Sequence, residues 1–214
     1  GQRPIDLHIR ALECLGANVE LDRGIVKVNG TNLKGNRIFL GGRHGSTVTG
    51  TSNAIMAAVL APGVTTIESS ACEPEIIDLC NMLVKMGANI VGIGSHFLTI
   101  EGVSKLCGCT HKVIPDRIEA ATYAIAAAIT QGEITINGAV SEHLGSFINV
   151  MQESGVSIET KSPSQLKVSL SQQELNSLEI ITLPYPGFPT DLQAQTCALA
   201  CKSNGLSILT ERVY

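Results

Sequence analysis

Two kinds of hydrophobic pattern alternate along the chain, and each occurs three times. The first pattern is an amphipathic helical segment, a glycine, and two short segments in which apolar and polar residues alternate. It starts near Ile5, near Glu75 and, in a weaker copy, near His143. Its glycines are Gly16, Gly87 and Gly155, about 70 residues apart. Glycine at this point suits a left-handed residue that ends a helix.

The second pattern is a helical segment of small residues, a glycine turn, and a strand rich in β-branched residues. Its glycines are Gly63, Gly132 and Gly205, again about 70 residues apart. Segments such as 120–128 are mostly alanine and have no clear polar face, which predicts helices that are buried on all sides. Together the two patterns predict an α/β fold of repeated βαβαββ units, with helices inside layers of sheet.

One segment, 102–115, matches neither pattern. We predict that it is a crossover between two groups of repeats, and we therefore divide the chain into residues 1–112 and 113–214. The acidic motifs at 72–75 and 116–119 are predicted to begin helices, because acidic side chains are favourable in the first turn.

The composition argues against several classes of binding partner. The chain has 214 residues, of which 44% are apolar and 16% are charged, as expected of a soluble globular protein. The formal net charge is −4 and aromatic residues make up 3%, so we do not expect a nucleic-acid partner. No apolar run is long enough to span a bilayer and no leader is evident, so we expect a cytoplasmic protein with no membrane partner.

Cysteine and histidine usage points to no metal. The seven cysteines are scattered and form no paired CxxC motif, which favours neither a disulfide framework nor a zinc site. The histidines, which have no metal-ligand spacing, are His8, His44, His96, His111 and His143. Cysteine usage indicates a reducing compartment and nothing more specific.

Five segments carry a resemblance to a known family. They read RPIDLH at 3–8, STVTGT at 46–51, CEPEIIDL at 72–79, PDRIEAATY at 115–123 and GFPTDLQAQ at 187–195. Because these segments occur in this order, the chain resembles the UDP-N-acetylglucosamine 1-carboxyvinyltransferases (UDP-N-acetylglucosamine enolpyruvyl transferases). The resemblance implies the inside-out α/β barrel of enolpyruvyl transferases, with three repeat units in each of two domains. It also implies that 1–112 are the later part of the first domain and 113–214 the first half of the second.

The resemblance implies an activity as well. Members of this family transfer the enolpyruvyl group of phosphoenolpyruvate to the 3-hydroxyl of UDP-N-acetylglucosamine, without a cofactor. This is the first committed step of peptidoglycan precursor synthesis, on which cell wall biogenesis, cell shape and cell division depend. The chain matches about half of the family's length, so the remainder of the same polypeptide is needed to complete both domains. A mobile loop with a Cys or Asp, and groups that hold phosphoenolpyruvate, fall outside it. We therefore expect no turnover by this chain alone.

Two alternatives stay open at this point. The sister enzyme that acts on shikimate phosphate shares the fold, but it gives no reason for the RPIDLH and GFPTD motifs. A non-catalytic repeat scaffold or binding module would use the repeats only to bury surface. Saturable binding of the UDP-sugar would argue against such a scaffold.

Asp191 is the predicted catalytic residue. It follows the rigid run 186–190 (PGFPT) at a helix start, where the residues alone allow an ordinary Asp N-cap. The resemblance implies instead that the Asp191 carboxylate contacts the sugar and accepts the proton of the 3-hydroxyl as this oxygen attacks phosphoenolpyruvate.

The first predicted binding segment is Arg3, Pro4, Ile5, Asp6 and Leu7. From the residues alone, Asp6 can cap the helix that follows. The Arg3 guanidinium is either solvated or binds a phosphate or a pyrimidine. The resemblance implies that this segment surrounds the uridine, largely through backbone groups.

The second predicted binding segment is Ser46, Thr47 and Val48, in a loop that precedes an apolar helix. From the residues alone, it is either a plain Ser/Thr cap or an anion cradle of backbone N–H groups. The resemblance implies that this loop binds the diphosphate of the nucleotide, and that the backbone of Val213 also touches the nucleotide. The departures from the family pattern are Ile5, where Val is common, Thr49, where Gly is usual, and Gly45, where some members have Lys. Candidate replacements for that charge are Arg43 and His44.

Overall fold

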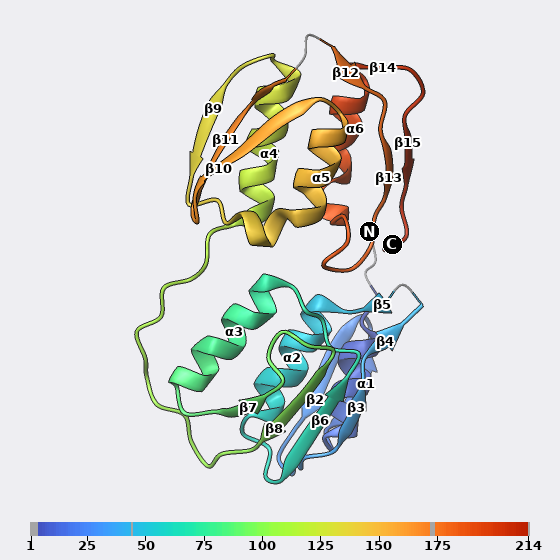
Figure 1. The fold of residues 1–214 in the computed structure, drawn as a ribbon. Coiled ribbons are helices and arrows are strands. Elements are labelled where there is room, and N and C mark those ends of the chain that lie inside the picture. The colour runs from blue at the N-terminus through green and yellow to red at the C-terminus, as the bar shows by residue number, and fades with distance from the viewer. Residues whose placement is uncertain (1–3, 44, 172–173, 214) are drawn as a thin grey trace. The chain divides into compact units, whose positions relative to one another are not determined.

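The computed structural model describes residues 4–43, 45–171 and 174–213, and the chain divides into two units, Gly1–Val113 and Ile114–Tyr214 (Figure 1). Each unit has its own hydrophobic core. The assignment of 1–112 and 113–214 to parts of two enolpyruvyl transferase domains stays a prediction. Within the described ranges, no helix combines the length and the apolar character needed to cross a membrane.

Unit 1 contains the helices α1 (Asp6–Cys14), α2 (Val48–Ala58) and α3 (Pro74–Lys85). Its strands are β1 (Asn18–Asp22), β2 (Ile25–Asn29), β3 (Arg37–Phe39), β4 (Gly41–Gly42), β5 (Gly45–Ser46), β6 (Val64–Glu68), β7 (Asn89–Val91) and β8 (Phe97–Glu101). A sheet has the order β3-β6-β8-β7, in which β3 and β6 are parallel and the other neighbours are antiparallel. Alternate residues of β8 are buried, because one face of the sheet packs on the core.

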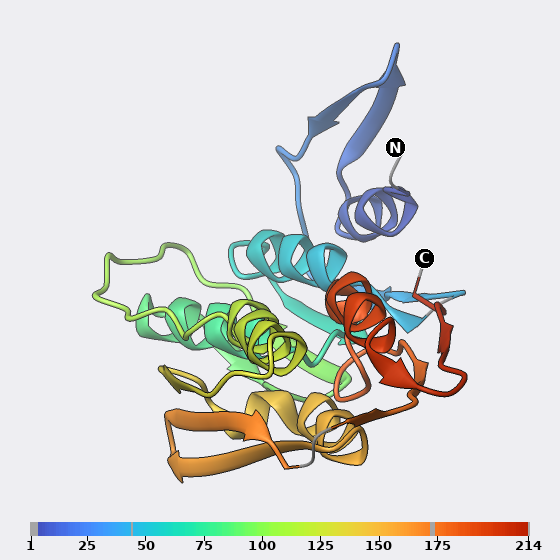
Figure 2. The same cartoon turned by 90° about the horizontal axis from the view of Figure 1, so that it is seen from above.

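The core of unit 1 lies between this sheet and its helices. Fully buried members include Leu15 of the turn after α1, Ile55 of α2, Cys80 of α3, Ile67 of β6 and Ile100 of β8. The β1–β2 hairpin lies outside the core, since only Val19 among its strand residues is even partly buried. Figure 2 shows this hairpin extending away from the other strands of the unit.

Unit 2 contains the helices α4 (Arg117–Ile129), α5 (Gly145–Glu153) and α6 (Gln193–Ala200), and the 3₁₀ turns η1 (Ser141–Leu144) and η2 (Thr190–Leu192). Its strands are β9 (Ile134–Asn137), β10 (Val156–Ser162), β11 (Gln165–Leu170), β12 (Leu175–Asn176), β13 (Glu179–Ile181), β14 (Ser203–Asn204) and β15 (Ile208–Thr210). One sheet has the order β10-β11-β9, and two parallel pairs are β12–β14 and β13–β15. Core members include Ala121 and Ala124 of α4, Phe147 and Met151 of α5, and Leu199 of α6.

The repeat predicted from the hydrophobic pattern is confirmed. Three times a helix is followed by a glycine and an antiparallel hairpin: α1 with β1–β2, α3 with β7–β8, and α5 with β10–β11. The three glycines have left-handed φ angles of 97° at Gly16, 103° at Gly87 and 92° at Gly155. At these angles a side chain would strain the backbone, which is why glycine ends each helix. The predicted helix starts are also confirmed, at Pro74 for α3 and at Arg117 for α4.

The prediction that the alanine-rich helices are buried on all sides is wrong for α4. Its buried residues are alanines and Ile125, whereas Glu119, Tyr123 and Ala126 are exposed, with Tyr123 57% exposed. These three residues follow a spacing of four and three positions, which places them on one face of a helix. Alanine does not distinguish a buried face from an exposed one, so the pattern concealed this face. The turn after α4 also differs, because Gln131 takes the left-handed φ, of 56°, one residue before Gly132.

The predicted crossover segment is bound to unit 1 as far as His111. The Cys107 N–H donates to Met86 O (2.8 Å). Lys85 Nζ donates to His111 Nδ1 (3.2 Å), so the imidazole proton lies on Nε2, which donates to Asp78 Oδ1 (2.9 Å). These bonds hold the segment against α3 as far as His111. Residues 112–115 then connect it to Asp116, the N-cap of α4.

Candidate functional site

A cavity of about 350 Å³ in unit 1 brings together the two predicted binding segments, which are about 40 residues apart in sequence. Residues from the helix entry that line it are Pro4, Asp6, Leu7 and His8. Residues from the β4–β5 loop that line it are Gly42, Arg43, Gly45, Ser46 and Thr47. Two predicted residues do not line the cavity: Ile5, just before α1, and Val48, the first residue of α2. The predicted contact from Arg3 lies outside the described residues, as does that from His44.

The prediction that Asp6 caps α1 is wrong. Ile5 occupies the N-cap position, and no side-chain hydrogen bond caps this helix. Asp6 is the first helical residue, so its backbone is already helical and its carboxylate does not reach back to the amides of the first turn. A carboxylate in this turn still interacts favourably with the positive end of the helix dipole.

Glycines shape the loop side of this cavity. Gly45 has a φ of 101°, which a side chain would strain, so a lysine at this position would require a different backbone. A Cβ on Gly42 would lie 3.3 Å from Leu7 Cδ1, which means that the loop backbone packs closely against α1. Gly42 and Gly45 therefore offer only backbone atoms to the cavity that they line.

Thr47 is the N-cap of α2, and the anion cradle stays a prediction. Its Oγ1 accepts from the Gly50 N–H (3.2 Å) and its carbonyl accepts from the Thr51 N–H (3.0 Å). The first four N–H groups of a helix have no partner within the helix. These four groups belong to residues 47–50, and Gly50 is the one with a side-chain acceptor. Among the described residues, no acceptor is found for the N–H groups of Thr47, Val48 and Thr49. These backbone donors lie at the positive end of α2, directly after Thr47, which lines the cavity. An anion is favoured at such a helix end.

His8 is a residue that the sequence reasoning missed. Its Nδ1 accepts from Asn53 Nδ2 (2.8 Å), so the proton lies on Nε2, which faces Thr49 Oγ1 at 3.2 Å. The imidazole therefore ties α1 to the first turns of α2 while it lines the cavity. Its place inside RPIDLH was the available signal, but its partners lie 41 and 45 residues away along the chain.

In unit 2, Asp191 lies in the middle of η2, and its side chain is exposed. The N-cap positions of η2 and α6 are Pro189 and Leu192, and neither start has a side-chain cap hydrogen bond. The ordinary reading of Asp191 as an N-cap is therefore wrong, and its carboxylate is left to other chemistry. Buried Phe188 anchors the turn that precedes it, and the Phe188 carbonyl accepts from the Leu183 N–H (2.9 Å).

Val213 lies near Asp191 through a shared partner rather than through direct contact. The Val213 N–H donates to Glu211 Oε1 (2.6 Å), and the Thr190 hydroxyl donates to Glu211 Oε2 (2.8 Å). The structure thus brings together Asp191 and Val213 in unit 2, and the two binding segments in unit 1. Glu211 was not predicted to belong to any site.

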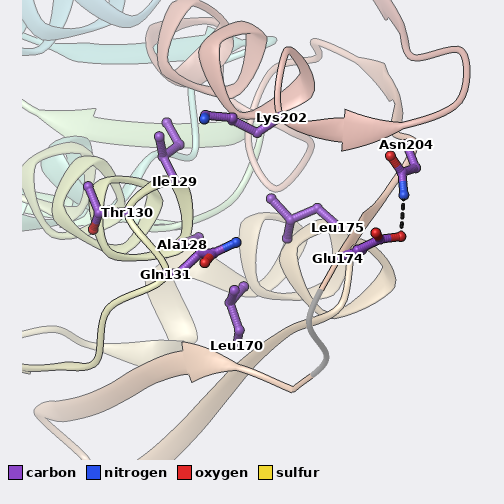
Figure 3. A pocket seen from close by; sticks show the side chains of 9 residues that line it. All are labelled: Ala128, Ile129, Thr130, Gln131, Leu170, Glu174, Leu175, Lys202 and Asn204. Carbon is purple, nitrogen blue, oxygen red and sulfur yellow. Dashed lines mark hydrogen bonds between the residues drawn. The ribbon is translucent and has the colours of Figure 1, made fainter.

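A second cavity, of about 450 Å³, lies in unit 2 and contains none of the predicted site residues (Figure 3). Figure 3 shows Glu174 beside Asn204, whose amide nitrogen donates to Glu174 Oε2 (2.5 Å). Ala128 and Ile129, at the carboxyl end of α4, also line it. Its charged lining residues are Glu174 and Lys202, and because no predicted site residue lines it we do not assign substrate binding to this cavity.

Two cysteines can be assigned a structural role. Burial raises the pKa of the Cys80 thiol to about 11. Burial, and then the neighbouring Glu73 carboxylate, raise the pKa of Cys72. Thiols of this kind stay protonated at neutral pH and are poor nucleophiles. Among the described residues, no group of three or more His, Cys, Asp or Glu side chains could hold a metal ion.

Comparison with known proteins agrees with the motifs. The sequence model of the EPSP synthase (3-phosphoshikimate 1-carboxyvinyltransferase) family matches residues 1–214. A relative from Methylacidiphilum infernorum (isolate V4), named UDP-N-acetylglucosamine 1-carboxyvinyltransferase, is 49% identical over 100% of this chain and 50% of its own length. A relative of the same name from Halothermothrix orenii is 47% identical over 100% of this chain and 50% of its own length. The chain therefore spans about half the length of the curated relatives it matches.

Solved structures agree with the fold. The enolpyruvyl transferase NikO from Streptomyces tendae superimposes with a TM-score of 0.87 at 18% identity, over 99% of this chain and 52% of that one. EPSP synthase from Acinetobacter baumannii gives a TM-score of 0.66 at 21% identity, over 97% and 48%. The predicted enolpyruvyl transferase fold is thereby confirmed. With a match that runs from the first residue to the last, the chain belongs to the EPSP synthase (3-phosphoshikimate 1-carboxyvinyltransferase) family.

Proposed function

We propose that the whole protein transfers the enolpyruvyl group of phosphoenolpyruvate to the 3-hydroxyl of UDP-N-acetylglucosamine. In this proposal, unit 1 of the chain supplies the nucleotide site and unit 2 supplies the proton acceptor. The observation that carries it is the cavity of about 350 Å³ in which the two segments of the resemblance meet. The names of relatives at 45–49% identity favour this acceptor sugar over shikimate phosphate.

The charges around the cavity suit a diphosphate. The N–H groups of Val48 and Thr49 lie at the positive end of α2. Arg43 is one of the residues that line the cavity. A guanidinium presents a planar set of donors that matches phosphate oxygens. The uridine would then lie along Pro4, Asp6 and Leu7, where the helix entry offers backbone groups and an apolar side chain.

Asp191 takes the proton in the proposed first step. The 3-hydroxyl oxygen forms a bond to C2 of phosphoenolpyruvate while its proton passes to the Asp191 carboxylate. The C2–C3 double-bond electrons take up a proton at C3, which gives a tetrahedral intermediate. The resemblance assigns that proton to a Cys or Asp that precedes the RPIDLH segment, and no cysteine of this chain is given the role.

In the second step, C3 loses a proton, the double bond re-forms, and the C2–O bond to phosphate breaks. The products are inorganic phosphate and the enolpyruvyl ether of the UDP-sugar. No cofactor enters either step. By the same proposal, the product enters peptidoglycan precursor synthesis in the cytoplasm.

The test is phosphate release by the whole protein from phosphoenolpyruvate and UDP-N-acetylglucosamine. Asp191→Asn is expected to lower kcat by about 10²- to 10⁴-fold, the usual contribution of a general base, with little change in KM. The matched control is Asp22→Asn, at an exposed position of β1, which should leave kcat unchanged. Release of phosphate only when shikimate 3-phosphate replaces the UDP-sugar would overturn the proposal, as would full activity of Asp191→Asn.

A further inference from the structure

The Glu211 carboxylate accepts hydrogen bonds from several parts of unit 2. Oε1 accepts from the Thr182 hydroxyl (2.7 Å) and from the Val213 N–H (2.6 Å), and Oε2 accepts from the Thr190 hydroxyl (2.8 Å). Glu211 directly follows β15, Thr182 directly follows β13, and Thr190 begins η2. One side chain therefore connects the end of the parallel strand pair, the turn that carries Asp191, and the segment that carries Val213.

The donors in this cluster have little freedom to turn elsewhere. Thr182 is 1% exposed, and its Oγ1 also accepts from the Arg212 N–H (2.9 Å), so the hydroxyl uses its donor and an acceptor at once. The Thr182 N–H donates to Thr210 O (3.0 Å), which continues the pairing of β13 with β15. This fixes the point from which the Glu211 side chain extends toward Thr190.

Thr190 is the direct link to the predicted proton acceptor. It immediately precedes Asp191 in a short 3₁₀ turn, so a rotation of the Thr190 backbone displaces the Asp191 carboxylate. The residues before Thr190 are held by bonds that do not involve Glu211. Ser146 Oγ donates to Gly187 O (2.9 Å), and the Leu183 N–H donates to Phe188 O. Loss of the Glu211 carboxylate should therefore release the end of the turn without unfolding the loop.

We propose that Glu211 is a positioning residue, which fixes the Asp191 carboxylate and the Val213 backbone relative to each other. This inference rests on the proposed function, because it assigns Asp191 to proton transfer. Glu211 acts through Thr190 and does not touch the reacting atoms itself. A displacement of about 1 Å in a catalytic group is enough to cost about 100-fold in rate, so a link of this kind has a measurable effect.

Glutamine is the conservative replacement at this position. Its amide oxygen can accept from the Thr182 hydroxyl and the Val213 N–H, and its amide nitrogen can donate to the Thr190 oxygen. Alanine removes these contacts. The pair Glu211→Gln and Glu211→Ala therefore separates the hydrogen-bonding role from the negative charge.

The kinetic test uses phosphate release by the whole protein. Glu211→Ala is expected to lower kcat by about 10- to 100-fold with a smaller change in KM, and Glu211→Gln to stay within about threefold of the unsubstituted protein. Glu133→Ala, which removes an exposed carboxylate from unit 2, is the control and should leave kcat unchanged. In an Asp191→Ala background, Glu211→Ala should cost less than about twofold more, because its effect passes through Asp191. A full additional loss in that background would show a general structural role and overturn the inference.

A second measurement keeps this inference separate from the proposed function. Amide hydrogen exchange of residue 188 and residues 190–192 in the 214-residue chain needs no turnover. Glu211→Ala should accelerate exchange there while exchange in α5 stays unchanged, and Glu211→Gln should not. If exchange follows this pattern but the whole protein releases no phosphate, the proposed function fails and the positioning contact stands. Unchanged exchange in Glu211→Ala would overturn the contact itself.

Discussion

Thr47→Val tests whether the cap of α2 orders the backbone donors in the first turn of this helix, next to the unit 1 cavity. Valine has nearly the shape of threonine but no hydroxyl, so the Gly50 N–H loses the acceptor that lies 3.2 Å away. The Thr51 N–H keeps its bond to the residue 47 carbonyl, at 3.0 Å. The substitution therefore loosens the first turn and leaves the rest of the helix in place.

The magnitude follows from the one bond that is lost. Removal of a Ser or Thr N-cap costs about 1 kcal/mol, which is about a fivefold change in the local opening equilibrium. The Val48 and Thr49 donors belong to the same turn, so ordering them again on binding should weaken UDP-N-acetylglucosamine affinity by about the same factor. Thr47→Ser keeps the acceptor oxygen and should restore both values.

The assay is amide exchange of Gly50 by NMR in this chain, together with calorimetric titration of the UDP-sugar. Thr99→Val, on an exposed position of β8, is the matched control and should change neither. The reasoning is refuted if Gly50 exchanges equally fast in the threonine and valine forms. It is also refuted if serine behaves like valine, since the cap bond would then be irrelevant.

Two further predictions concern a buried thiol and a strained glycine. The pKa of Cys80 rises from about 9.0 to about 11 on folding, so the folded chain holds a proton that the unfolded chain releases between these values. The free energy of unfolding should therefore fall by roughly 3 kcal/mol as pH rises through this range. Urea unfolding at pH 8 and pH 11 should show a smaller difference between the two pH values in Cys80→Ala than in the unsubstituted chain. Equal pH dependence of the two proteins would contradict this prediction. Gly45→Ala places a side chain at a φ of 101°, which costs about 1–3 kcal/mol. Calorimetric titration should show that this variant binds the UDP-sugar several-fold more weakly. The control is Gly108→Ala, where a Cβ meets nothing within 4 Å, and it should bind normally.

Local signals predicted most of the fold. Gly16, Gly87 and Gly155 end helices because a left-handed residue is needed there, and this requirement can be read from sequence. The exposed face of α4 was not predicted, because alanines on both sides of the helix hide which side Tyr123 occupies. Gln131 was not predicted to be left-handed, because glutamine carries no preference for that region.

The candidate site was predictable only in part. The segments that meet in the unit 1 cavity could be chosen from the motifs, but their meeting is a tertiary contact between α1 and the β4–β5 loop. His8 and Glu211 were missed for the same reason, since the side chains that they contact lie 21 to 45 residues away. Asp6 was assigned as a cap because sequence alone does not fix the first helical residue to within one position.

The central claim is that the unit 1 cavity holds the diphosphate of a uridine nucleotide sugar. The most direct measurement is calorimetric titration of this chain with UDP-N-acetylglucosamine, comparing Arg43→Gln with the control Arg10→Gln on the exposed face of α1. The account predicts saturable binding that Arg43→Gln weakens about tenfold, the loss expected for one charge-assisted contact, and that Arg10→Gln leaves unchanged. Equal affinity of the two variants, or no binding by a folded chain, would contradict it.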